Sequence, residues 1–181
     1  KKRYKGLVPK NCELRCGSKY TLLREEFIIE KKKKRKKSKT KSKTIFLAMG
    51  GADHSNINID ILKVLKNVNI NQNIQVNIVT TNANRNLDKL KKYCTNKRWI
   101  NLHINSNKIA KLMAKSDFAI VTPSVTVNEV HYLNLPMIII KTADNQIDMY
   151  EYLNKNGYLS LNKFDSKKLY KHILNIMEKL G

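Results

Sequence analysis

Cysteine is scarce in this chain of 181 residues, which has only Cys12, Cys16 and Cys94. Three irregularly spaced thiols are too few for a disulfide framework. Cys12 and Cys16 could form half of a zinc site, but no second Cys/His pair lies near them in the sequence, and the four histidines are scattered. We therefore expect reduced structural thiols in a cytoplasmic protein, with no metal and no cofactor.

Long apolar runs and a leader segment are also missing. No run approaches the roughly 20 residues that a membrane-spanning helix needs, so no membrane span is expected. The chain begins Lys1-Lys-Arg, without a methionine or a signal-like segment, which favours a piece of a longer protein. Its length and its 41% hydrophobic residues suffice for one domain with a core, plus an extension.

Acidic residues are few: 14 Asp and Glu stand against 36 Lys and Arg, for a net charge of +22. Such an excess suggests a nucleic-acid partner. However, ten of the cations fall in residues 31–43, a run that contains no acid and no aromatic residue to stack on bases. A solvated face or linker is the favoured interpretation of this run, and nucleic acid is not the expected partner.

Apolar strand patterns and helical patterns alternate along most of the chain. The first strand is expected at 44–49, and further strands are expected at 74–79, 99–104, 118–121 and 135–140. Helical patterns separate them, and a short segment at 158–161 precedes a final amphipathic helix. This alternation is typical of a parallel sheet covered by helices on both faces. The sequence predicts a Rossmann-like three-layer α/β/α domain over 44–181, preceded by an interdomain segment and basic helix or linker over 1–43.

The first candidate site follows the first strand, at Gly50 and Gly51. Two glycines let the backbone turn tightly and approach a ligand, and the N–H groups of the next helix favour an anion such as a diphosphate. The alternative is an ordinary strand-to-helix turn with Asp53, Ser55 or Asn56 as the helix cap. The segment is neither a G-x-G-x-x-G motif nor a P-loop.

The second candidate site is the polar stretch 122–130, which lies between two buried strands. Ser124 and Thr126 could hold phosphate with the helix N–H groups, and the Glu129 carboxylate could accept both hydroxyls of a ribose. The alternative is a plain helix cap with an acid that favours the helix dipole.

The third candidate site is the segment 143–146. The amides of Asn145 and Gln146 could hold sugar hydroxyls, or they could cap the following helix. Because the carboxyl ends of parallel strands lie at one edge of a sheet, all three segments should converge there. Together they predict a site for a phosphorylated sugar or a nucleotide.

Several motifs resemble known families. The stretch 124–129, followed by Leu135-Pro136 and Asn145-Gln146, resembles the C-terminal domain of B-fold glycosyltransferases such as the bacterial peptidoglycan N-acetylglucosaminyltransferase. Further motifs at 4–9, 12–17, 20–27 and 49–53 make the chain similar to the UDP-sugar hydrolases of the bacterial pseudaminic acid pathway. This resemblance covers nearly the whole chain except the basic run.

The resemblance implies two Rossmann-like domains with a UDP-sugar in the cleft between them. Water would release UDP from a diacetamido-trideoxy-altrose, on the way to a nine-carbon acid that decorates flagella. Glu129 would bind the uridine ribose. The diphosphate would be held by Gly50, Gly51, Ser124 and Thr126, and the residues facing substrate would be Arg24, Asn56, Asn145 and Gln146.

One departure from that family concerns the catalytic base. The family's general-base histidine lies in an N-terminal domain that has no counterpart here, and His54 is the one tempting substitute. The chain alone is therefore expected to bind UDP without turning over substrate, since a base must reach the attacking water. Two alternatives stay open: a UDP-sugar glycosyltransferase, which shares the Glu129 segment but not the features at 17 and 20–27, and a basic module that binds nucleic acid or acidic lipid through 31–43.

Overall fold

The computed structural model describes residues 4–17, 20–33 and 42–180. Most of the basic run lies outside these ranges, so its predicted role as a solvated face or linker stays a prediction. Among the described residues, no helix combines the length and apolar character needed to cross a membrane. Within the same ranges, no three His, Cys, Asp or Glu side chains gather as metal ligands would.

Six parallel strands in the described part of the chain form one sheet, in the order β3-β2-β1-β4-β5-β6. The predicted strands are all present, and the short segment before the last helix supplies a sixth, at the sheet edge. The strand predicted at 135–140 begins only at Met137, because Pro136 has no N–H to donate to a neighbouring strand. The bounds are β1 (Lys43–Ala48), β2 (Ile74–Thr80), β3 (Ile100–Ile104), β4 (Phe118–Val121), β5 (Met137–Ile140) and β6 (Leu159–Leu161).

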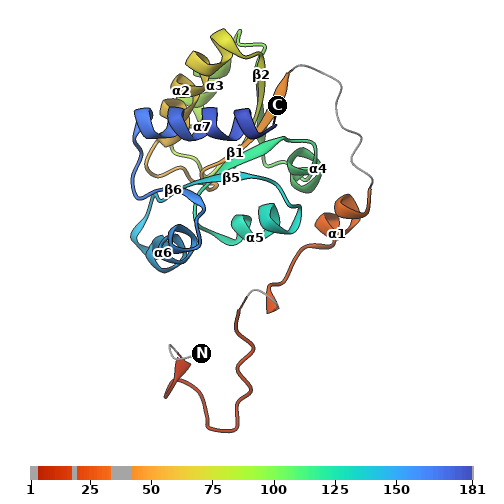
Figure 1. The fold of residues 1–181 in the computed structure, drawn as a ribbon, viewed down its shortest axis with the longest axis vertical. Coiled ribbons are helices and arrows are strands. Elements are labelled where there is room, and N and C mark those ends of the chain that lie inside the picture. Colours follow the sequence, from red (N-terminus) through yellow and green to blue (C-terminus); the bar gives the residue numbers. More distant parts are fainter. Residues whose placement is uncertain (1–3, 18–19, 34–41, 181) are drawn as a thin grey trace.

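Helices cover both faces of the sheet, as Figure 1 shows. One face carries α2 (Ile57–Asn71), α3 (Leu87–Cys94) and α7 (Ser166–Leu180). The other carries α1 (Glu25–Lys32), α4 (Ile109–Ala114), α5 (Val125–Tyr132) and α6 (Ile147–Lys155). Every residue of β4 and of β5 is buried, because both faces of these central strands are covered. The predicted Rossmann-like three-layer fold is confirmed.

The strand order reverses between β1 and β4, which are neighbours in the sheet although two strands separate them in sequence. Ala48 at the end of β1 lies beside Val121 at the end of β4, and Val121 lies beside Ile139 of β5. Ligands of open α/β sheets bind in the crevice at such a switch point. The loops that follow β1, β4 and β5 therefore meet where the sequence predicts a site.

The helix α1 packs onto this domain although it precedes the first strand. Of its eight residues, Phe27 is the buried one, and it lies in the same core cluster as Met113 of α4 and Val127 of α5. Figure 1 shows α1 beside α4, while the described residues 20–24 before α1 lead away from the domain. The division at residues 43 and 44 stays a prediction, but α1 is in contact with the domain that follows it.

Candidate nucleotide-binding site

The loop after β1 is built around a glycine that no other residue could replace without a shift. The Gly51 carbonyl accepts hydrogen bonds from the Thr80 hydroxyl at 3.2 Å and the Thr81 hydroxyl at 3.0 Å. A Cβ at Gly51 would lie 2.9 Å from the Thr81 side chain. Gly50 has a φ of 80°, in the region that favours glycine. Both glycines thus have structural reasons to be here, and their predicted contact with a diphosphate stays a prediction.

The start of α2 already holds a carboxylate of the protein itself. Asp53, which is buried, accepts from the Ile57 N–H at 3.0 Å, the Asn58 N–H at 3.4 Å and the Asn58 side-chain amide at 2.8 Å. Burial raises the pKa of Asp53 above its usual value, and these hydrogen bonds oppose that rise. Of the three predicted caps, Asp53 is the one that binds the helix amides. An anionic ligand at α2 would have to compete with it.

Asp53→Ala is expected to lower the free energy of unfolding by about 2 kcal/mol. The variant removes the acceptor for the first amides of α2, a loss of about 1–2 kcal/mol, and places alanine at a φ of 39°. Chemical denaturation at pH 7 measures the change. Asp60→Ala, which removes a half-exposed carboxylate on the same helix, should cost less than about 0.5 kcal/mol. Equal losses in the two variants would contradict the capping role.

The start of α5 differs from that of α2. Ser124 occupies the cap position in an extended conformation, yet within the described residues its hydroxyl makes no cap hydrogen bond. Ser124 and Thr126 are both half-buried. The first N–H groups of this helix and the two hydroxyls thus offer donors at the carboxyl end of β4. This is the arrangement that a phosphate group needs.

The second predicted feature of α5, the Glu129 carboxylate, is buried and paired with Arg24. Its side chain is 10% exposed, and its Oε1 accepts from Arg24 Nε at 3.2 Å and from Nη2 at 3.0 Å. Burial raises the pKa of Glu129 above its usual value, while the Arg24 guanidinium opposes that rise. Two of the predicted site residues are therefore in direct contact, although 105 positions separate them.

A hydroxyl and amide cluster joins the ends of β4 and β5, and Gln146 is the one member that was predicted as a contact residue. The Gln146 carbonyl oxygen accepts from the Thr122 hydroxyl at 2.7 Å and from the Thr142 N–H at 2.8 Å. The two threonine hydroxyls lie 3.2 Å apart. Gln146 thus folds back onto the strand ends, whereas Asn145 beside it is exposed. The signal for this cluster is a threonine within two residues of the end of each of two buried strands: Thr122 follows β4 directly, and Thr142 follows β5 after Lys141.

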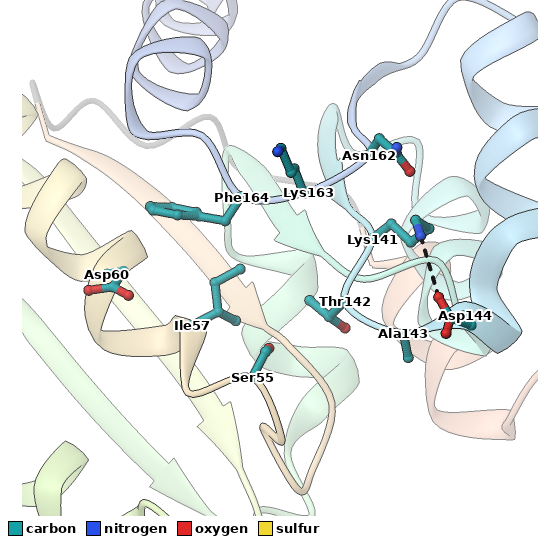
Figure 2. Close-up of a pocket in the computed structure, with 10 residues that line it drawn as sticks. All are labelled: Ser55, Ile57, Asp60, Lys141, Thr142, Ala143, Asp144, Asn162, Lys163 and Phe164. Carbon is teal, nitrogen blue, oxygen red and sulfur yellow. Dashed lines mark ion pairs between the residues drawn. The ribbon is translucent and has the colours of Figure 1, made fainter.

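A pocket of about 320 Å³ opens at the same edge of the sheet, between the start of α2 and the loops after β5 and β6. Figure 2 shows Lys141 and Asp144 on one side of it, joined by an ion pair of 4.0 Å, with Lys163 nearby. Its lining contains none of the predicted contact residues, but Ser55 and Asp144 are the chain neighbours of Asn56 and Asn145. Sequence reasoning missed Lys141 and Lys163, the two cations of this pocket.

The loops after three adjacent strands bring most of the predicted residues to one edge, and Arg24 joins them through Glu129. Asn56 lies just before α2 with a φ of 51°, and its buried Oδ1 has no hydrogen-bond partner among the described residues. His54 lies in the same loop and is exposed. The complete predicted set is Arg24, Gly50, Gly51, Asn56, Ser124, Thr126, Glu129, Asn145 and Gln146.

The chain is a Rossmann-like α/β domain of the kind found in B-fold glycosyltransferases. The spinosyn rhamnosyltransferase SpnG, solved with thymidine diphosphate, matches 77% of the chain over 38% of its own length, with a TM-score of 0.57 and 12% identity. MurG of Acinetobacter baumannii matches 95% of the chain over 49% of its length, with a TM-score of 0.58 and 13% identity. At these identities the likeness concerns the fold alone.

Sequence comparison points to a particular relative. The chain is 38% identical over 155 residues to the UDP-2,4-diacetamido-2,4,6-trideoxy-beta-L-altropyranose hydrolase of Campylobacter jejuni, which confirms the resemblance noted from the motifs. The match covers 86% of this chain and 53% of the hydrolase. An uncharacterized protein of Methanocaldococcus jannaschii is 32% identical over 81% of the chain and 31% of its own length. The chain thus spans about half or less of these relatives, and no family model matches it.

Proposed function

We propose that this chain is the nucleotide-binding part of a UDP-sugar hydrolase. The full-length protein would release UDP from UDP-2,4-diacetamido-2,4,6-trideoxy-beta-L-altropyranose, in a cytoplasmic pathway that makes pseudaminic acid for flagellin glycosylation. The observation that carries the proposal is the helix after β4, where a buried carboxylate, Glu129, follows a helix start whose Ser124 hydroxyl makes no cap bond. The likeness to the hydrolase supplies the choice of substrate.

In this proposal each part of the nucleotide has its own contacts. Glu129 accepts the hydroxyls of the uridine ribose, as a buried carboxylate with a cation beside it can do. The diphosphate lies against the first amides of α5, with hydroxyl contacts from Ser124 and Thr126 and close approach at Gly50 and Gly51. The sugar side of the site is formed by Asn56, Asn145 and Gln146, whereas Arg24, predicted as a substrate contact with them, pairs with Glu129 on the ribose side.

The general base is proposed to come from another domain. His131 lies 3.1 Å from the Tyr158 hydroxyl at the end of α5, and His103 of β3 lies 3.2 Å from the Asn77 side chain. His172 is on α7, which covers the face opposite α5. His54 lies in the loop after β1, at the same edge of the sheet as the candidate site, but its side chain is exposed. The chain alone should therefore bind UDP and leave the UDP-sugar intact.

A calorimetric titration of the chain tests this proposal. UDP is expected to bind, while CMP and ADP, added at the same concentration, should give no measurable heat of binding. Incubation of the chain with the UDP-sugar should release no UDP. The proposal fails if UDP does not bind, or if the three nucleotides bind equally well.

A UDP-sugar glycosyltransferase is the second candidate, because the solved structures with this fold named above include a rhamnosyltransferase. The two activities differ in the group that attacks the anomeric carbon. With the full-length protein in ¹⁸O-labelled water, a hydrolase places the label in the free sugar. A transferase releases UDP only when an acceptor is supplied, and the sugar carries no label.

A further inference from the structure

We propose that Arg24 is a positioning residue that makes this site select ribonucleotides over deoxyribonucleotides, by holding Glu129 in the orientation that accepts the ribose hydroxyls. The inference rests on the proposed function, because it needs a nucleotide beside Glu129. It assigns Arg24 a task different from the direct substrate contact that the family resemblance implies.

The geometry of the pair favours this task. Nε and Nη2 of Arg24 both donate to Oε1 of Glu129, at 3.2 Å and 3.0 Å, so neither of these bonds uses Oε2. Two donors from one planar guanidinium hold Oε1 in place. Oε2 receives no bond from Arg24 and is the acceptor left for a ribose hydroxyl.

Arg24 is itself held by α1. Its Nη1 lies 2.7 Å from Oε1 of Glu26, and its guanidinium carbon lies 4.9 Å from the centre of the Phe27 ring. Both hydrogen bonds that Arg24 makes to a carboxylate go to Glu129, and Glu26 lies close enough to hold the guanidinium by charge. The structure thus favours an action of Arg24 through Glu129.

Burial gives the pairing an energetic reason. Glu129 is 10% exposed on its side chain whereas Arg24 is 53% exposed, so the carboxylate is the partner that needs compensation. A buried carboxylate without a cation tends to take up a proton, and a protonated group has lost acceptor capacity for hydroxyls. Arg24 therefore contributes both the direction and the charge state that hydrogen bonding to a ribose requires.

Four proteins decide the question: the unaltered chain, Arg24→Ala, Glu129→Gln and the double variant, each titrated with UDP, 2′-deoxy-UDP and uridine. The unaltered chain should bind UDP roughly ten-fold or more tightly than 2′-deoxy-UDP, the value of one hydrogen bond to a charged group. Arg24→Ala should bring this ratio close to one, while the ratio of UDP to uridine affinity changes little. In the Glu129→Gln background, Arg24→Ala should have no further effect on the ratio of UDP to 2′-deoxy-UDP, since residues acting as a unit are not additive.

Arg15→Ala is the matched control, because Arg15 also pairs with a glutamate, at 3.1 Å, but in the exposed segment before α1. It should leave both ratios unchanged. Arg24→Lys keeps the charge but loses the second donor nitrogen. Its ratio of UDP to 2′-deoxy-UDP affinity should therefore lie between those of the unaltered chain and Arg24→Ala. This variant is the second test if Arg24→Ala does not fold.

Three results would overturn the inference. A fall in the ratio of UDP to uridine affinity, with deoxy discrimination intact, would place Arg24 on the phosphates. If Arg24→Ala lowers the thermal midpoint and leaves both affinity ratios unchanged, the Arg24–Glu129 pair only stabilises the contact between α1 and α5. No binding of UDP by the unaltered chain would reject the proposed function itself, and the inference with it.

Discussion

Glu129→Gln is expected to weaken binding of UDP by about 10- to 100-fold, or about 1.4–2.8 kcal/mol. Glutamine has nearly the same shape but no charge. With its one acceptor oxygen facing the Arg24 donors, its NH2 group faces the ribose and cannot accept from the hydroxyls. The affinity for 2′-deoxy-UDP should fall much less. Glu13→Gln, at an exposed carboxylate outside the site, is the control and should leave the affinity unchanged.

The same residue predicts how UDP affinity depends on pH. Burial raises the pKa of Glu129 above 4.5, so the carboxylate takes up a proton at a higher pH than a free glutamate does. Affinity that needs the ionised form is complete above this raised pKa and is lost as the pH falls through it. The terminal phosphate of UDP also changes its charge, with a pKa of about 6, so Glu129→Gln supplies the baseline. An identical pH profile for the two proteins would show that Glu129 is not the group that titrates.

The sheet was predictable because its signal is local. Residues 118–121 and 137–140 are continuous apolar runs, and each becomes a central strand with every side chain buried. Strands that are covered on both faces read this way in any parallel sheet. The convergence of the polar loops followed from the same pattern, since it depends on the strand direction and not on side-chain detail.

The contacts inside the site were not predictable, because they depend on side chains that meet only after folding. Arg24 and Glu129 each had a predicted role, but nothing in the spacing of residues 105 positions apart indicates that they bind each other. Asp53, Ser55 and Asn56 were equivalent as caps of α2, and the backbone geometry of the loop selects Asp53. Gln146 has the polarity of a sugar contact, yet its carbonyl oxygen lies against Thr122 and Thr142.

One side chain, Phe27, supplies the buried apolar contact between α1 and the domain. Phe27 is fully buried against α4 and α5, whereas its neighbours Ile28 and Ile29 are 37% and 47% exposed. The rest of the attachment is polar: Lys31 lies 4.3 Å from the centre of the Tyr132 ring and donates to the Tyr132 carbonyl. An isolated helix of this length is unstable in water, so α1 should exist only while it is docked.

Phe27→Ala is expected to remove about 3 kcal/mol or more of packing energy, and to release α1 from the domain while the sheet stays folded. Hydrogen exchange should show the α1 amides losing roughly 100-fold of their protection, with the β1 amides little changed. Ile29→Ala, on the exposed side of the same helix, is the matched control and should leave α1 protected. Because Arg24 is held beside Phe27, the release should also abolish discrimination between UDP and 2′-deoxy-UDP. Retained protection of α1 in Phe27→Ala, or equal loss in Ile29→Ala, would contradict this account of how α1 supports the site.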